Sequence, residues 1–192
     1  MRMTSFKILY LGLMICFILA FNASAFHPSK LPTEPVIDNY RKWTRANQQT
    51  VQMEAAVAAL CAPAAPVKQN PGVKPNPSPH KDKFINVYVN PTGQHALTLE
   101  RSPHFPEGSI IVKEKLSSAT STTPELLTVM VKRQRGYNPA SNDWEFLVVN
   151  GDTKTIIERG KLEHCTACHA SQRGNDFIFR NYLTQSDWQK MK

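Results

Sequence analysis

The segment Cys165-Thr166-Ala167-Cys168-His169 has the spacing C-x-x-C-H, which is the attachment motif of a c-type haem. Two thiols three residues apart lie on one side of a helical turn, so both can reach the vinyl groups of one haem. The imidazole of His169 can then bind the iron as its proximal ligand. The motif therefore predicts one covalent haem c, attached through Cys165 and Cys168, with His169 as the iron ligand.

Two other kinds of site share part of this pattern. A thioredoxin-like redox pair uses C-x-x-C in a βαβ setting and has no use for the histidine. A zinc site needs further cysteine or histidine ligands, and His164, directly before Cys165, could be one. The haem interpretation accounts for every residue of the motif, and we prefer it over these two alternatives.

The N-terminus has the pattern of a secretory signal peptide. A short basic region precedes the apolar residues 8–21, and Ala23-Ser24-Ala25 fits a cleavage site. The apolar run is shorter than the roughly 20 residues of a membrane span. Cys16 does not follow a small residue, as it would in a lipoprotein signal. We therefore expect residues 1–25 to be removed, the protein to be periplasmic, and no membrane span to remain after cleavage.

Charge and cysteine content limit the partners. The chain has a formal net charge of +8 at pH 7, and its basic residues are scattered. Such a charge suits an acidic redox partner protein, and the absence of a basic patch with interleaved aromatic residues argues against nucleic acid. Cys61 remains outside the haem motif, and its role is left open between a free thiol and an intermolecular disulfide.

The chain length after cleavage, 192 − 25 = 167 residues, fits one domain. We expect a flexible N-terminus over residues 26–38 and a haem domain over residues 39–192. Residues 63–80 are rich in proline and predict an extended segment on the surface. Residues 39–61 predict a helix, because the alanine-rich stretch before residue 61 has high helix propensity, and Gln48-Gln49-Thr50 could break this helix in two.

Five segments after residue 80 are rich in strand-forming residues. Because the gaps between them are too short for crossover helices, the strands should be antiparallel. A short helix after Gly151 should contain the haem motif. The sequence thus predicts an α+β fold, mainly an antiparallel sheet with flanking helices and haem c attached near the C-terminus. The five segments are Phe84–Val89, His95–Leu99, Ser109–Leu116, Leu126–Arg133 and Trp144–Val149.

This layout differs from the common haem c folds. Only 192 − 169 = 23 residues follow His169, whereas small electron-transfer cytochromes have the motif near their N-terminus. The ordinary cytochromes c′ have it near the C-terminus, but within a four-helix bundle. The β-rich composition of residues 84–149 argues against that bundle.

In the order and spacing of its motifs, the chain resembles the cytochrome P460 family, which also includes the β-type cytochromes c′. The resemblance extends from about Asn39 to Leu183, most of the chain left after cleavage. It rests on Asn39-Tyr40-Arg41 with Trp43, Val87–Pro91, Phe105–Glu114, Asn142-Asp143-Trp144, and the haem motif followed by Asp176 and Phe179.

The resemblance implies a homodimer and a five-coordinate haem with an open distal face. P460 enzymes oxidise hydroxylamine and have a lysine joined covalently to the haem ring, and Lys113 matches that lysine. β-type cytochromes c′ lack this cross-link and bind nitric oxide. Two positions depart from the enzymes: Ile85 stands in place of an arginine, and Thr128 in place of a distal carboxylate.

Two functions from different classes follow. The first is a haem-dependent oxidoreductase acting on a small nitrogen substrate such as hydroxylamine. The second is a non-catalytic haem protein that binds nitric oxide or transfers electrons. Thr128 weakens the first, because a carboxylate at that position could take a substrate proton.

Strand alternation bears on Lys113 independently of the resemblance. Lys113 and Lys115 share one face of their strand, and Glu114 lies on the other with apolar neighbours. Lys113 could face the haem, or both lysines could simply face solvent. Glu114 should either pair with a cation or lie in water at the strand end. The remaining histidines, including His80, are expected at the surface.

Overall fold

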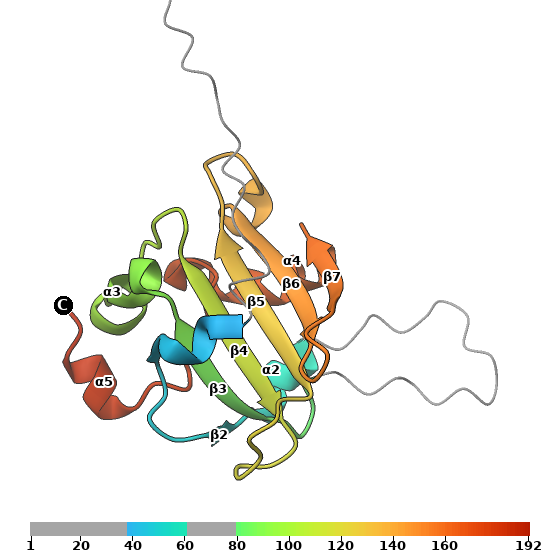
Figure 1. Ribbon diagram of the computed structural model, residues 1–192. Coiled ribbons are helices and arrows are strands. Elements are labelled where there is room, and N and C mark those ends of the chain that lie inside the picture. The colour runs from blue at the N-terminus through green and yellow to red at the C-terminus, as the bar shows by residue number, and fades with distance from the viewer. Residues whose placement is uncertain (1–37, 61–79) are drawn as a thin grey trace, which may run out of the picture. The chain divides into compact units, whose positions relative to one another are not determined.

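The computed structural model describes residues 38–60 and 80–192 (Figure 1). Several predictions lie outside these residues: the signal peptide over residues 1–25, the flexible segment before residue 38, the path of the proline-rich segment, and the role of Cys61. They stay predictions, as do the exact domain boundaries.

A seven-stranded antiparallel sheet forms the centre of the described fold, in the order β1-β3-β4-β5-β6-β7, with β2 also pairing with β3. This confirms the predicted α+β class dominated by an antiparallel sheet. The strands are β1 (Thr44–Arg45), β2 (Val51–Gln52), β3 (Phe84–Val89), β4 (Ile110–Leu116), β5 (Leu126–Lys132), β6 (Trp144–Asn150) and β7 (Ile156–Gly160).

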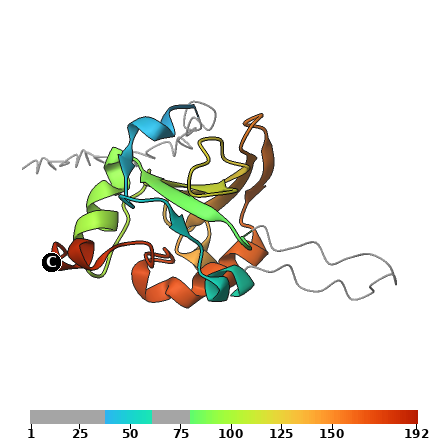
Figure 2. The ribbon, with the colours of Figure 1, turned by 90° about the horizontal axis from the view of Figure 1, so that it is seen from below.

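Short helices cover both faces of this sheet. The two views place α2, α4 and η3 on one face and η1 on the other (Figures 1 and 2). None of the described helices is long and apolar enough to cross a membrane. The helices are η1 (Tyr40–Lys42), α2 (Ala55–Leu60), α3 (Pro91–Leu99), η2 (Pro139–Ser141), α4 (Glu163–His169), η3 (Ala170–Asn175) and α5 (Gln185–Gln189).

The predicted helix over residues 39–61 is wrong for most of its length. Only η1 and α2 are helical there, and β1 and β2 pair with the edge of β3 instead. The amide of Ala46 donates to the carbonyl of Val87 at 2.8 Å, and the side chain of Asn47 accepts from the Val87 amide at 2.8 Å. Pairing the backbone groups of β3 therefore outweighs the helix propensity of this segment.

The predicted strand over His95–Leu99 is also wrong, because α3 extends over it. The Asn90 side chain accepts from the Gly93 amide at 3.1 Å, and Pro91 occupies the first turn. An asparagine cap followed by proline is a strong helix start. The buried side of this helix, with Ala96 and Leu97, then packs into the core.

The sheet separates two sets of buried residues. On the α4 side the core includes Val87, Ile111, Phe146 and Ile178. On the η1 side it includes Tyr88, Val112, Leu127 and Leu147. Side chains alternate along β4 between these two faces, as the sequence predicts, so Lys113 and Lys115 lie on the α4 side and Glu114 on the η1 side.

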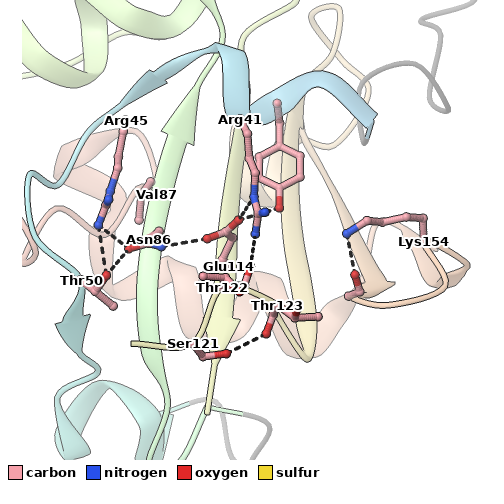
Figure 3. A network of polar contacts seen from close by, with 12 residues as sticks. Arg41, Arg45, Thr50, Asn86, Val87, Glu114, Ser121, Thr122, Thr123 and Lys154 are labelled. Atoms are coloured by element: carbon pink, nitrogen blue, oxygen red, sulfur yellow. Dashed lines mark hydrogen bonds and ion pairs between the residues drawn. The ribbon is translucent and has the colours of Figure 1, made fainter. Parts of the chain in front are cut away.

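Glu114 is 1% exposed and lies in a closed hydrogen-bond network on the η1 face (Figure 3). Its carboxylate accepts from the Tyr40 hydroxyl at 2.7 Å, from Nε of Arg41 at 2.7 Å and from Nδ2 of Asn86 at 2.9 Å. Of the two predicted alternatives for Glu114, pairing with a cation is therefore the correct one. The network fixes η1 against the sheet and leaves the opposite face for the site.

Candidate haem site

A cavity of about 510 Å³ is enclosed by the sheet, α4, and the C-terminal segment after η3. Its volume lies in the range of about 300–1,000 Å³ that is typical of small-molecule and cofactor sites. Most of the lining is apolar, with Met130, Phe146, Ile178 and Phe179 among its residues. The cavity is thus large enough for a cofactor and suited to an apolar ring.

His169, at the end of α4, lines this cavity. Its Nδ1 lies 2.6 Å from the carbonyl oxygen of Phe177, which can only accept, so Nδ1 is the protonated nitrogen. Nε2 therefore keeps its lone pair for a metal. Burial lowers the pKa of His169 to about 4, which keeps the ring neutral as an iron ligand requires. The rings of Phe146 and Phe179 pack against it at 5.4 and 5.1 Å.

The two cysteines of the motif lie on α4 but differ in state. Cys165 lines the cavity as a free thiol, and burial raises its pKa to about 12. Cys168 is buried and disulfide-bonded. A thioether at Cys168 forms from its thiol, so this disulfide must be reduced before a haem can be attached at both cysteines.

These observations fit a haem better than a zinc ion. A haem iron needs one axial ligand from the protein, and His169 presents one at an apolar cavity. A structural zinc site needs four ligands. Within residues 38–60 and 80–192, no group of three or more histidine, cysteine, aspartate or glutamate side chains is arranged to hold a metal ion.

A comparison with protein families matches residues 37–180 to the cytochrome P460 model. The chain belongs to the cytochrome P460 family. The match covers 180 − 37 + 1 = 144 of the 192 residues and contains the sheet, the haem motif and the described cavity-lining residues except Tyr182. Membership implies a haem cytochrome. No curated protein gives a significant match to the chain.

Lys113, which matches the cross-linked lysine of P460 enzymes, lies in this cavity. Its Nζ is 5.7 Å from the ring centre of Phe179 and 5.9 Å from that of Tyr182. Desolvation lowers the pKa of Lys113 to about 8, although the side chain keeps some surface toward the cavity. Lys113 does not face bulk solvent, and a substantial fraction of its amine is neutral near pH 8.

The two positions that depart from P460 enzymes lie on the same face of the sheet. Thr128 lines the cavity and pairs with Lys113 across β4 and β5. Ile85 is buried in the core and pairs with Lys115 across β3 and β4. Glu158 is the one carboxylate among the described lining residues; it is 46% exposed and pairs with His164.

Three polar residues of the cavity were not predicted. Lys115 is 1% exposed, and strand alternation with Lys113 could have indicated its position. His80 lines the cavity, which corrects its expected surface location. Tyr182 lines it too, and its hydroxyl is buried with no hydrogen-bond partner in the part of the chain that the structure describes. Nothing in the sequence around His80 or Tyr182 indicates these positions.

Other candidates lie elsewhere. His95 and His104 are exposed, as predicted. Arg133 pairs with Glu145. Met130 is buried in the core and also contributes to the cavity lining.

Proposed function

We propose that this P460-family protein is an exported mono-haem c-type cytochrome with an open distal site that oxidises a small nitrogen compound such as hydroxylamine. The main support is the presence in one apolar cavity of both His169 and Lys113. His169 has the tautomer of a proximal ligand, and Lys113 matches the lysine that P460 enzymes join to haem.

Each residue of the site would have a distinct role. Cys165 and Cys168 hold the cofactor covalently, and Nε2 of His169 binds the iron. The haem supplies an iron that can bind a small nitrogen ligand and accept its electrons. The apolar side chains around it exclude water and competing ligands. A redox partner protein would then receive the electrons, and we propose a homodimer as the assembled form.

Lys113 has the properties that a cross-link requires. Its amine must be neutral to bond to a ring carbon, and its lowered pKa favours that form. The new N–C bond replaces one N–H and one C–H bond. The step is a two-electron oxidation and therefore needs an oxidant such as a peroxide. The bond would change the electronic properties of the ring, which is one way in which a protein tunes haem reactivity.

The second candidate is a haem protein that binds nitric oxide or transfers electrons without turnover, like a β-type cytochrome c′. Thr128 favours it, because a threonine cannot take a substrate proton as a carboxylate can.

Steady-state oxidation of hydroxylamine by the purified haem protein, with an artificial electron acceptor, separates the two candidates. We expect turnover that is slow but proportional to protein concentration, and its loss in Lys113→Met. The control, Lys83→Met, removes a lysine that pairs with Glu125 and does not line the cavity. Nitric oxide binding without turnover by the unmodified protein would favour the second candidate. The molecular mass of the unmodified protein in solution tests the proposed homodimer, which predicts twice the mass of one chain.

A further inference from the structure

The backbone carbonyl that holds His169 lies in a strained stretch of chain. Nδ1 of His169 donates to the carbonyl oxygen of Phe177 at 2.6 Å. Both Asp176 and Phe177 have positive φ angles, of 51° and 64°. This left-handed conformation is unfavourable for residues other than glycine, and most of all for a bulky side chain such as that of phenylalanine. Surrounding contacts must therefore hold the two residues in it.

The side chain of Asp176 makes most of these contacts. It is buried, and both oxygens of its carboxylate accept from Nζ of Lys132 at 2.8 Å. The carboxylate also accepts from Nδ2 of Asn142 at 2.6 Å and from the backbone amide of Phe105 at 2.9 Å. These donors come from the end of β5, the loop between η2 and β6, and the loop before β4. One carboxylate thus ties the chain after η3 to three parts of the sheet region.

The peptide unit between Asp176 and Phe177 is fixed at both of its polar groups. Its carbonyl oxygen accepts from Nε1 of Trp144 at 2.9 Å, and this indole is fully buried at the start of β6. Its amide donates to the carbonyl of Gln172 in η3 at 2.8 Å. The orientation of this unit sets the direction of the next carbonyl along the chain, which is the one that His169 uses.

Buried charge makes this arrangement hard to change. Lys132 is 7% exposed, and its Nζ lies 5.0 Å from the ring centre of Trp144 as well as beside Asp176. A buried ion pair that is reinforced by further hydrogen bonds favours one arrangement, because removing either partner leaves an uncompensated charge. The ion pair therefore offsets the strain of the left-handed turn.

We propose that Asp176 is a positioning residue for His169, because its hydrogen bonds hold the turn that directs the Phe177 carbonyl at Nδ1. This inference rests on the proposed function, in which Nε2 of His169 binds the iron. The hydrogen bond at Nδ1 fixes the tautomer of the ring and raises its basicity as a metal ligand. A more basic ligand favours ferric over ferrous iron, so Asp176 acts through His169 on the reduction potential.

The test compares variants of the purified haem protein in which one buried carboxylate is neutralised. Asp176→Asn weakens the cluster beside His169, and asparagine tolerates the left-handed conformation. Glu114→Gln is the matched control, because Glu114 also accepts from three donors, one of them a cation, but on the opposite face of the sheet.

A milder variant keeps the test decisive if Asp176→Asn does not fold. Asn142→Gly removes one hydrogen bond to Asp176, and glycine suits the φ of 50° at that position. Circular dichroism shows which variants are folded, and Asn142→Gly decides the outcome if Asp176→Asn is not.

The first measurement is the iron–histidine stretching band of the ferrous haem, recorded by resonance Raman spectroscopy. A weaker hydrogen bond at Nδ1 weakens the bond from Nε2 to iron, so the band should move to lower wavenumber in Asp176→Asn and by less in Asn142→Gly. It should not move in Glu114→Gln. An unshifted band in the folded cluster variants, or an equal shift in the control, would overturn the proposal. Absence of the band from the unmodified protein would overturn it too, since His169 would then not bind the iron.

The second measurement is the reduction potential. In Asp176→Asn, reduction of the iron should become more favourable by up to about tenfold, or about 59 mV for a one-electron couple. The potential of Glu114→Gln should equal that of the unmodified protein. An unchanged or lower potential in Asp176→Asn would contradict the positioning role.

Hydroxylamine turnover by the unmodified protein separates this inference from the proposed function. If the band and the potential shift in Asp176→Asn but the unmodified protein has no turnover, the positioning role stands and the proposed oxidation fails. If there is turnover but neither property shifts, the oxidation stands and the positioning role fails.

Discussion

The two faces of β4 treat buried charged side chains in opposite ways. On the η1 face, Glu114 accepts hydrogen bonds from Tyr40, Arg41 and Asn86 (Figure 3). On the cavity face, Lys113 and Lys115 are desolvated, and this burial lowers their pKa values. Three consecutive residues therefore have two different electrostatic environments.

The difference separates a structural from a functional use of buried charge. A buried ion whose hydrogen bonds are all made holds elements together, as Glu114 holds η1 to the sheet. A buried amine without a counter-charge costs stability, and such groups concentrate at sites where a neutral nucleophile or base is needed. The cavity face of β4 has this second character.

The largest effect is expected when the two cysteines that would attach the haem are replaced. The double substitution Cys165→Ala and Cys168→Ala leaves no thiol at either position for thioether bonds. Haem should then be lost from the chain after denaturation. Haem staining of a denaturing gel measures this directly. Haem that stays with the doubly substituted chain would contradict attachment at this motif.

Glu114→Ala should strongly destabilise the opposite face. The substitution leaves the buried Tyr40 hydroxyl and the Asn86 amide without their acceptor, and removing one partner of a buried network costs about 3 kcal/mol or more. Chemical denaturation gives this change in the free energy of unfolding. Glu114→Gln, which can still accept hydrogen bonds, should cost clearly less. Equal losses in both variants would mean that the network contributes little.

Lys113 should make stability depend on pH in protein that lacks haem, such as the doubly substituted variant. Its pKa is lowered to about 8 when folded, from 10.5 when unfolded. Between these values the unfolded chain binds a proton that the folded chain does not, so the free energy of unfolding rises with pH. Below pH 8 Lys113 is charged in both the folded and the unfolded chain. The free energy of unfolding is then lowered by the full cost of burying this charge.

The contribution expected from Lys113 between pH 8 and pH 10 is about 2 kcal/mol at most, at 1.36 kcal/mol per pKa unit and with some exposure toward the cavity. Above pH 10 the raised pKa values of Tyr40 and Tyr182 act in the opposite direction. Adding Lys113→Met should remove this contribution and leave that of Lys115, whose pKa is also lowered by burial. Denaturation curves at pH 7, 8, 9 and 10 measure it, and an identical rise without Lys113 would refute the assignment.

The smallest effect is expected from Thr128→Glu. A carboxylate there would lie opposite Lys113 in the cavity and could take a substrate proton. General-base help is worth about 10²–10⁴-fold where it is otherwise absent. Because the cation of Lys113 opposite it would lower the pKa of this carboxylate and weaken it as a base, the gain in hydroxylamine turnover should fall below that range. Thr128→Gln, of the same size but without basicity, should give none.

The sequence predicted the parts of the site that local rules determine. Strand alternation and the family resemblance together indicated Lys113 and Thr128, and the motif spacing indicated Cys165, Cys168 and His169. The helix start at Asn90-Pro91 was present in the sequence, but the segment after it was interpreted as a strand. β7 was missed because it is an edge strand whose residues are mostly exposed, without the usual alternation.

The remaining site residues depend on tertiary packing. His80 lies directly after a proline-rich segment, and only the position of β4 decides that it meets Lys115. Tyr182 follows η3, where no periodic pattern marks a buried side. The pairing of β1 and β2 with β3 likewise depends on a strand about 40 residues away, so the helix predicted over residues 39–61 forms only in its last turns, as α2, and in the short η1.

The optical spectrum of the reduced protein tests the central claim most directly, namely that the cavity holds a haem with His169 as its protein ligand and an open distal face. We predict a five-coordinate, high-spin ferrous haem, with a broadened and strongly red-shifted Soret band if Lys113 is joined to the ring. A six-coordinate, low-spin spectrum in both oxidation states would show that a second protein ligand closes the site, and would contradict the account.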